Sequence, residues 1–419
     1  MKSILKIKYS EWHSYIALLV VVVLFAFDLR TFLGGLLPIS LVTSGILFIL
    51  CYCFYSLFLS SRQAALTKVR DFDVLICVFI IMYGLRMCYN IYLEQIDQFL
   101  FNNRITCIVY YLFLCIFPYA ICRRVPWAKM NMCKLLWILF VLFLLGLLAS
   151  YQAILNTFAS GDRFAGGRAD ANALLDTIGY GHTALSFIFI CCSLFTFYTS
   201  KWRWFLIFPI LFGFLSMGMA NSRSPFVALF AIIGLIFLLR INLKFLVAGA
   251  VGLTLIIFNV DAIDLFFKEY FNSGFVERII TMFELGMKAS SGRDSLYADG
   301  IQLFLDNPIF GRAIILISGE AKGIYVHNAI IEVFMGLGLV GGVLFLLILL
   351  KAFMYAIYLF RNKNQYRFFA LIFIQYLIFL QFSRTLIYLP LFWASLACVY
   401  SCYLLKKNEK NEKNSNCYS

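Results

Sequence analysis

Charged residues are scarce in this 419-residue chain, at 13% of the sequence, whereas hydrophobic residues make up 63%. Soluble globular domains are typically about one quarter charged and about half apolar. The shortage of charge excludes an ordinary soluble fold, because so many exposed Leu, Ile and Phe side chains need lipid as their solvent. A chain of this length could form about two or three soluble domains. Its composition instead predicts an all-α fold, a single polytopic bundle of transmembrane helices.

Histidine is even scarcer, with three in the whole chain, which argues against a multi-histidine metal site. The thirteen cysteines do not replace it, because the two longest loops between apolar runs, residues 156–176 and 261–326, contain none. Most of the cysteines lie in apolar runs: Cys51, Cys53, Cys77, Cys115, Cys191, Cys192, Cys398 and Cys402. This placement argues against a disulfide framework or a structural zinc, so we expect them to pack as small apolar side chains.

Acidic side chains are outnumbered, with 21 Asp and Glu against 35 Lys and Arg, which gives a formal net charge of +14. Such an excess can mark a protein that binds nucleic acid. Here the basic residues gather in short loops between apolar runs, which is typical of the cytoplasmic loops of membrane proteins. The expected partner is therefore the lipid bilayer, and no nucleic acid is expected.

Apolar runs of roughly 17 residues or more recur along the chain, and each could cross a bilayer as a helix. About twelve spans are expected, at 13–29, 33–59, 72–93, 104–122, 135–155, 177–199, 204–220, 224–239, 245–260, 327–350, 367–383 and 386–405. If each run crosses once, the basic loops share one face, which places both termini in the cytoplasm. Residues 1–405 would then form the bundle, and the polar tail 406–419 is predicted to be disordered.

Two long loops, 156–176 and 261–326, would lie on the opposite, outer face. Within the second, the stretch RDSLYADGIQLFL at 293–305 has apolar residues at broadly helical spacing. These are Leu296, Ile301, Leu303, Phe304 and Leu305. The pattern predicts an amphipathic helix that lies on the membrane surface.

Several arginines fall on this outer face, against the usual bias. Lys268, Arg278, Lys288 and Lys322 lie in a long loop and are expected to be solvated. Arg223 and Arg384 each occupy a tight turn between two apolar runs, NSRSP and FSRTL, where a charge is expensive unless it meets an anion or lines a watery cavity. Arginine binds phosphate oxygens with two parallel hydrogen bonds, so the turns favour a phosphate-bearing ligand. Snorkelling to the surface is the alternative.

A histidine, His327, opens the tenth run directly after the larger outer loop, in VHNAIIEVFMGLGLVGG. Imidazole titrates near neutrality and could act as a general base. The alternative is a polar residue that caps a helix, a role that Asn328 fits equally well. The glycines that follow, Gly336, Gly338, Gly341 and Gly342, are expected to let helices approach closely in lipid. His182, one turn into the sixth run, receives no role, and Arg86 in the third run is expected to pair with a helix-end carbonyl.

The block 292–342 resembles the signature of the O-antigen ligase and polymerase superfamily. The shared features are an arginine that opens an amphipathic helix, an Asn-Pro-x-x-Gly turn, a His-Asn pair and a Gly-rich span. The SRSP turn around Arg223 is similar to the Ser/Thr-Arg turn of that family. About twelve spans with one dominant periplasmic loop also match its topology.

The resemblance implies a metal-independent, cofactor-free glycosyltransferase of the inverting, GT-C-like type in the bacterial inner membrane. Its donor would be an oligosaccharide on undecaprenyl diphosphate, and its acceptor a sugar hydroxyl on the periplasmic face. Carried onto this sequence, Arg223 and Arg293 hold the diphosphate and His327 activates the acceptor. Further substrate-binding candidates are Arg163, Arg168, Arg312, Arg384 and Asn328.

Alternatives within and outside the superfamily stay open. The short segment GRAIILISGEAKGIYV before His327 favours a repeat-unit polymerase over a ligase that transfers polymer to lipid A-core. A chain-length regulator or a flippase is a candidate partner of either. The chain could instead be a transporter or lipid flippase, a non-catalytic assembly partner, or a peptidoglycan polymerase. The outer position of the long loops and the scarcity of deep acidic residues disfavour a transporter.

Overall fold

A computed structural model describes residues 15–19, 21–25, 70–93, 104–159, 177–220, 222–239, 254, 258–271, 276, 280, 293–318, 321–362 and 364–416. These residues form helices and connecting loops, and no strand occurs among them. Within this part of the chain the predicted all-α fold is confirmed.

The elements follow the apolar runs of the sequence. In chain order they are α4 (Asp71–Cys88), the π-helical turn η2 (Tyr89–Leu93), α5 (Arg104–Tyr111), the π-helical turn η4 (Leu112–Ile116), α6 (Phe117–Arg124), η5 (Trp127–Lys129), α7 (Met132–Ala159), α8 (Thr177–Phe197), η7 (Lys201–Leu206), α9 (Ile207–Met219), α10 (Ser224–Leu239), α12 (Val260–Phe271), α14 (Arg293–Asp306), α15 (Ala329–Arg361), α16 (Arg367–Phe382), η9 (Leu386–Tyr388) and α17 (Pro390–Asn416).

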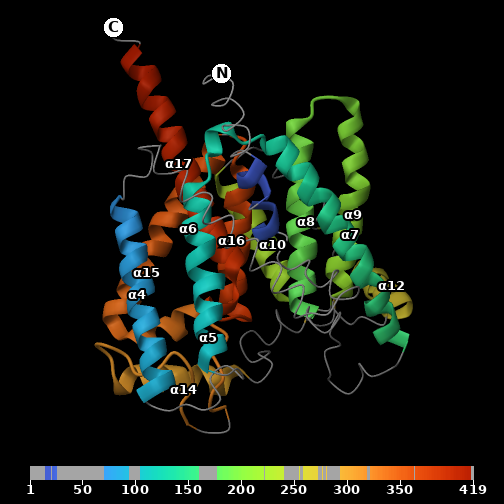
Figure 1. Cartoon of the computed structure of the whole chain (residues 1–419). Helices are drawn as coiled ribbons and strands as arrows, with labels where there is room; N and C mark the ends of the chain where they lie inside the picture. Colours follow the sequence, from blue (N-terminus) through green and yellow to red (C-terminus); the bar gives the residue numbers. More distant parts are fainter. Residues whose placement is uncertain are drawn as a thin grey trace.

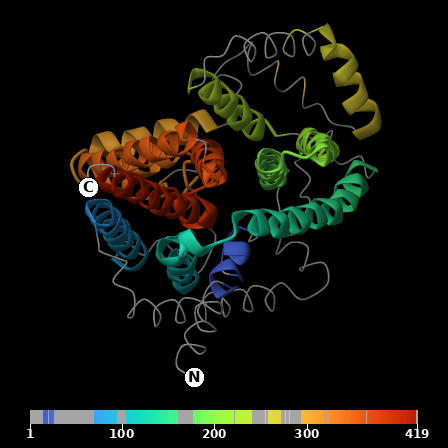
Figure 2. The same ribbon diagram turned by 90° about the horizontal axis from the view of Figure 1, so that it is seen from above.

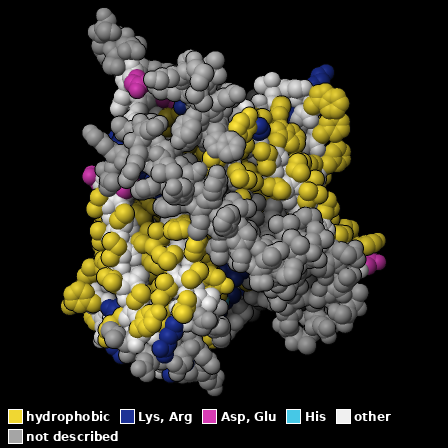
Figure 3. Space-filling model, viewed as in Figure 1, with side chains coloured by type: hydrophobic (Ala, Val, Ile, Leu, Met, Phe, Trp, Pro, Cys, Tyr) yellow, Lys and Arg dark blue, Asp and Glu magenta, His cyan; other side chains and the backbone are white. Residues whose placement is uncertain are grey.

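Six helical segments among the described residues are long and apolar enough to cross a membrane. They are Asp71–Tyr92, Arg104–Arg124, Met132–Tyr151, Ile178–Phe197, Lys201–Met219 and Ala329–Arg361, and the shorter apolar helices α10 and α16 lie beside them. Hydrophobic side chains cover much of the flanks of the described helices in Figure 3, and most charged side chains in that view lie near the two ends. The chain is therefore a multi-pass membrane protein. The count of about twelve stays a prediction, because run 33–59 and most of run 245–260 lie outside the described residues.

Helix α16 joins the bundle together, because it packs against α15 and α17 on one side and against α8 and α10 on the other. Helix α4 packs on α15, and α6 packs on α17, as the view along the bundle in Figure 2 shows. Consecutive long helices alternate in direction, so α14 and the end of α16 lie at one end of the bundle in Figure 1. The last turns of α17 and the α8–α9 connection lie at the other. These are termed the α14 end and the α17 end.

The predicted amphipathic helix is α14, and it runs across its end of the bundle rather than along it (Figure 1). Leu296, Leu303 and Phe304 pack into a small apolar cluster with residues that include Met335 of α15. Ile301, a member of the predicted apolar set, is instead 46% exposed. This orientation is the one that a helix lying on a membrane surface requires.

Helix α15 is broken at Gly338, which has a φ of 64° and a ψ of −158°. The loop after α14 fills the break: the N–H of Arg312 donates to the Met335 carbonyl at 2.7 Å, and the N–H of Leu339 donates to the Pro308 carbonyl at 2.7 Å. Backbone polar groups that leave a helix inside a membrane need such partners. A Cβ at Gly338 would stand 2.3 Å from the Ile309 oxygen. This glycine admits a loop backbone, which differs from the helix-to-helix packing that the sequence predicts.

The end of α17 also differs from expectation. The composition predicts a disordered tail from residue 406, whereas α17 continues as a helix to Asn416. The segment carries Lys and Glu at helical spacing, and Lys406 Nζ lies 2.6 Å from Glu409 Oε2 three residues on. Such pairs support an exposed helix, which the polar composition alone does not reveal.

Candidate active site

Three predicted site residues are held by backbone carbonyls of residues 381–385, termed the α16 turn. This segment comprises the last two residues of α16 and the three residues that follow it. Arg293 Nη1 at the start of α14 donates to the carbonyl of Phe382. His327 Nδ1 lies 3.2 Å from the Ser383 carbonyl oxygen, and Asn328 Nδ2 donates to the Gln381 carbonyl at 3.4 Å. Residues from two separate segments of the chain are therefore held on one turn.

The geometry of His327 is unusual. Its φ of 56° is the one positive value among the described non-glycine residues, and such a conformation costs about 1–2 kcal/mol. A carbonyl can only accept, so the contact with Ser383 puts the ring proton on Nδ1 and leaves the lone pair on Nε2. The Tyr325 ring packs beside the imidazole with centroids 4.3 Å apart. Strained residues that are held in this way are often functional.

Asn328 caps α15, since its Oδ1 accepts from the N–H groups of Ile330 at 3.0 Å and Ile331 at 3.1 Å. Of the two roles considered for the His-Asn pair, a helix cap and a general base, the structure assigns the cap to Asn328. Asn328 caps the start of the helix, as an asparagine at this position often does. His327 stands outside the helix and is not needed to cap it.

Arg384 and Arg223 approach the same end of the bundle. The Arg384 guanidinium carbon lies 5.8 Å from the centre of the Phe379 ring, and the His182 ring stacks on that same ring with centroids 3.8 Å apart. His182 Nε2 is in turn 2.8 Å from the hydroxyl of Ser224, the residue after Arg223. A chain of contacts thus runs from the α16 turn to the start of α10.

His182, to which the sequence analysis assigned no role, lies in the core of the bundle. It is fully buried, and its Nδ1 has no hydrogen-bond partner in the described structure. Gln375 Nε2 donates to the His182 carbonyl at 2.7 Å, and its amide also pairs with Ser186. These polar residues join α8, α10 and α16 in the core. The polar Gln375 in the middle of the apolar run 367–383 was the signal that could have revealed these contacts.

Arg312 occupies the break in α15 rather than the α16 turn. Its carbonyl accepts from Arg86 Nη1 and from Asn90 Nδ2, both at 3.3 Å, and Arg86 Nη2 donates to the Phe310 carbonyl at 2.8 Å. The partners of Arg86 are therefore two carbonyls of the loop that follows α14, and not the helix-end carbonyl that the sequence predicted. The role of the Arg312 side chain in substrate binding stays a prediction.

Two further candidates, Arg163 and Arg168, lie outside the described residues, so their roles also stay predictions. Tyr297 stands one turn after Arg293 on α14. Burial raises the pKa of its hydroxyl, an effect that Arg293 opposes and Asp294 reinforces. Tyr297 is therefore a neutral hydrogen-bond donor beside the Arg293 guanidinium at ordinary pH.

A buried carboxylate lies next to the α16 turn. Glu332 is one helical turn beyond Asn328 and is fully buried. Its Oε1 accepts from the hydroxyl of Tyr83, from Thr385 Oγ1 at 2.9 Å and from the N–H of Leu386 at 3.4 Å. In the described part of the chain, no group of three or more His, Cys, Asp or Glu side chains lies close enough together to hold a metal ion.

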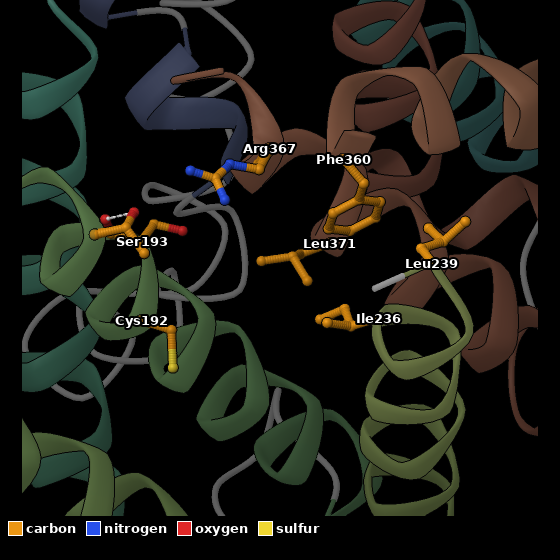
Figure 4. Close-up of a pocket in the computed structure, with 8 residues that line it drawn as sticks. Cys192, Ser193, Ile236, Leu239, Phe360, Arg367 and Leu371 are labelled. Carbon is orange, nitrogen blue, oxygen red and sulfur yellow. Dashed lines mark hydrogen bonds between the residues drawn. The ribbon is translucent and has the colours of Figure 1, made fainter. Parts of the chain in front are cut away.

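A cavity of about 160 Å³ lies at the α17 end, between the ends of α8, α10 and α15 and the start of α16. Figure 4 shows Arg367 at its edge, with Leu371 and Phe360 between the two facing helices. Ligand pockets are usually about 300–1,000 Å³, so this cavity is too small for an oligosaccharide. It is also about 23 Å from the α16 turn, because the 16 residues of α16 span 15 steps that each rise about 1.5 Å.

Comparison with known protein families bears on the same region. Residues 208–346 match the family described as O-antigen ligase. The match runs from α9 into α15, so it includes Arg223, Arg293 and His327. This part of the chain is similar to the O-antigen ligase family. This supports the O-antigen ligase and polymerase superfamily that the motifs predict, and with it a glycosyltransferase activity of the ligase or polymerase type in O-antigen biosynthesis. No curated protein and no solved structure matches the chain.

Proposed function

We propose that this membrane protein is a repeat-unit polymerase, which transfers a glycan from undecaprenyl diphosphate to a sugar hydroxyl of a second lipid-linked glycan. The observation that carries the proposal is the α16 turn, which holds Arg293 and His327 through neighbouring carbonyls. A permanent cation and a base are thereby fixed at one place. A transfer from a diphosphate donor to a hydroxyl needs these two groups.

The donor side depends on the arginines. Diphosphate is a weakly basic leaving group, so it needs its growing charge neutralised more than it needs a proton. Arg293 and Arg223 can do this through paired hydrogen bonds to phosphate oxygens, and Arg384 on the α16 turn lies at the same end of the bundle. Their guanidinium groups stay charged at all physiological pH values, which is consistent with a reaction that needs no divalent ion.

The acceptor side depends on His327. Its Nε2 carries the lone pair and accepts the proton of the acceptor hydroxyl. The hydroxyl oxygen then bonds to the anomeric carbon of the donor from the face opposite the diphosphate. The bond from that carbon to the diphosphate oxygen breaks with its electron pair, so undecaprenyl diphosphate leaves and the configuration inverts.

A polymerase is favoured over a ligase by the segment between the Asn-Pro turn and His327. Residues 311–326 are few, and Ala313, Ile314, Ile315 and Leu316 are almost completely buried. Little chain is therefore left here to form a surface for a second large acceptor such as lipid A-core. Transfer of finished polymer to that core is the alternative within the same superfamily.

The proposed active face is periplasmic. Basic residues near the α17 end include Arg123, Arg124, Lys129, Lys201, Arg203, Arg361 and Lys406. The positive-inside rule assigns that end to the cytoplasm of the bacterial inner membrane, which leaves the α14 end in the periplasm. A flippase that delivers the donor there, and a chain-length regulator, remain proposed partners.

A transporter is the competing function, since a broken α15 and a buried Glu332 are features that secondary transporters share. In this chain, however, the loop after α14 already pairs backbone groups on both sides of the break, including the Met335 carbonyl. Those groups are therefore not available to coordinate a transported ion. Movement of a labelled substrate without glycosidic bond formation would support the transporter.

The test is complementation of a deletion strain, read from the banding of its surface polysaccharide. Loss of long chains with one repeat retained supports a polymerase, whereas loss of all repeats with accumulation of lipid-linked polymer supports a ligase. Arg293→Ala and His327→Ala should abolish restoration while the protein still inserts in the membrane. Arg361→Ala, an exposed arginine at the α17 end, is the matched control and should restore banding. Full restoration by both site variants would overturn the assignment.

A further inference from the structure

We propose that Glu332 is a positioning residue, which fixes the α16 turn and thereby sets the places of His327 and Arg293 for glycan transfer. This inference rests on the proposed function. It concerns a residue that touches neither proposed substrate and acts only through the turn.

The contacts of Glu332 come from two directions. Tyr83 donates from α4, while Thr385 and Leu386 donate from the segment that follows α16, and all three hydrogen bonds reach the same oxygen, Oε1. The second oxygen, Oε2, is buried and accepts no hydrogen bond in the described structure. A carboxyl group buried in a membrane protein is costly unless it is well partnered. The three donors account for what Oε1 does: it ties α4, α15 and the α16 turn together.

The consequence for the site follows from the order of residues in the turn. The carbonyls that hold Asn328, Arg293 and His327 belong to consecutive residues, 381 to 383. The group that Glu332 holds begins two residues later, at Thr385. The start of α15 and the α16 turn are therefore joined at two places. His327 and Asn328 contact the carbonyls of residues 383 and 381, and Glu332 contacts Thr385. Without Glu332, Thr385 would lose its link to α15, and the contacts of His327 and Asn328 would be left to join the start of α15 to the turn.

The residues that follow the α16 turn are also held by side chains of other elements. Trp393 Nε1 donates to the Leu386 carbonyl at 3.0 Å, and Cys115 Sγ lies 3.2 Å from the same oxygen. Tyr83 is supported by the ring of Tyr111, with centroids 5.8 Å apart. Glu332 thus contacts Tyr83 on one side. On the other side it contacts Thr385 and Leu386, which follow the residues whose carbonyls orient the proposed base. A shift of about 1 Å in such a group can lower a rate about 100-fold.

The chemistry of the contact distinguishes two variants. Glu332→Gln keeps an acceptor oxygen for the same three donors, whereas Glu332→Leu keeps the volume and removes the acceptor. We expect Glu332→Gln to retain at least about one third of the turnover, and Glu332→Leu to lose about 10- to 100-fold. Rescue by the amide would show that hydrogen bonding, not charge, is what Glu332 supplies.

The experiment uses the purified full-length protein in lipid vesicles, with undecaprenyl-diphosphate-linked repeat units extracted from the strain as donor and acceptor. Turnover and KM are measured for the wild type, both Glu332 variants, Thr385→Val, and the double variant Glu332→Leu with Thr385→Val. Because the two residues share one hydrogen bond, their losses should not add. Asp73→Asn is the matched control, a buried carboxylate on α4 that pairs with Arg123 instead. It should leave the turnover of the inserted protein unchanged.

Three results are informative. An inactive wild type contradicts the proposed function itself. An active wild type with full turnover in Glu332→Leu or Thr385→Val overturns the positioning role alone, as do additive losses in the double variant. If Glu332→Leu fails to insert, Thr385→Val decides the question, because it removes one donor and leaves the carboxyl group in place.

Discussion

Replacement of Gly338 by alanine tests the break in α15 most directly. An alanine there would adopt a φ of 64° with a ψ of −158°, a combination that only glycine takes readily, and such backbone strain costs about 1–3 kcal/mol. Its Cβ would also stand 2.3 Å from the Ile309 oxygen and 2.5 Å from the Gly311 nitrogen. These are backbone atoms, which cannot rotate away as a flexible side chain would. The loop after α14 must therefore move.

The magnitude follows from what that movement breaks. The N–H of Leu339 loses the Pro308 carbonyl and the N–H of Val340 loses the Ile309 carbonyl, at about 0.5–1.5 kcal/mol for each hydrogen bond. Added to the strain, the expected loss is about 2–6 kcal/mol of unfolding free energy. Thermal unfolding of the purified protein in detergent measures it, as a lower midpoint temperature.

The matched control for this change is Gly234→Ala in α10. No atom lies within 4 Å of a Cβ at that glycine, and alanine favours a helix over glycine by about 1 kcal/mol. Its midpoint should be equal to or higher than that of the wild type. If Gly338→Ala unfolds at the same temperature as Gly234→Ala, the break in α15 is not held in the way described.

Three further changes test separate contacts. Arg86→Met removes the donors to the carbonyls of the loop after α14 and should lower the unfolding free energy by about 1–3 kcal/mol, with an unchanged midpoint as the contradicting result. His182→Phe keeps the ring on Phe379 and removes the hydrogen bond to Ser224, so a similar loss is expected in the same assay, and a variant as stable as the wild type would show that this bond contributes little. Phe382→Leu should keep most of the glycan transfer, because the carbonyl of that residue, not its ring, holds Arg293. A loss as large as that of Arg293→Ala would refute this reasoning.

Much of the fold could be predicted because it depends on periodic apolar patterns. The amphipathic stretch 293–305 corresponds to α14, and the run that follows His327 corresponds to α15. These elements are specified by local sequence, since lipid requires each spanning backbone to satisfy its own hydrogen bonds. The residue types of the site could also be predicted, because an arginine or a histidine next to an apolar run stands out from its neighbours in charge and polarity.

The parts that could not be predicted depend on contacts between distant segments. Gly338 resembles any small residue at a helix interface, and only the position of Ile309 reveals why it must be glycine. Glu332 lies close to the outer end of its span in the sequence, yet it is fully buried because Tyr83 and Thr385 come to it from other elements. Neither partner carries a local signal of that contact.

The α16 turn could not be predicted from the sequence, because it acts through its backbone carbonyls. The last carbonyls of any helix lack partners within the helix, and in lipid such groups must be satisfied. At the end of α16 the donors are the side chains of Arg293, His327 and Asn328. One arrangement therefore meets two needs, because it satisfies the end of a membrane helix and orients a cation and a base. Since a carbonyl is present whatever the side chain, the residues at 381–383 need no distinctive chemistry, and the turn can be recognised only once its donors are located.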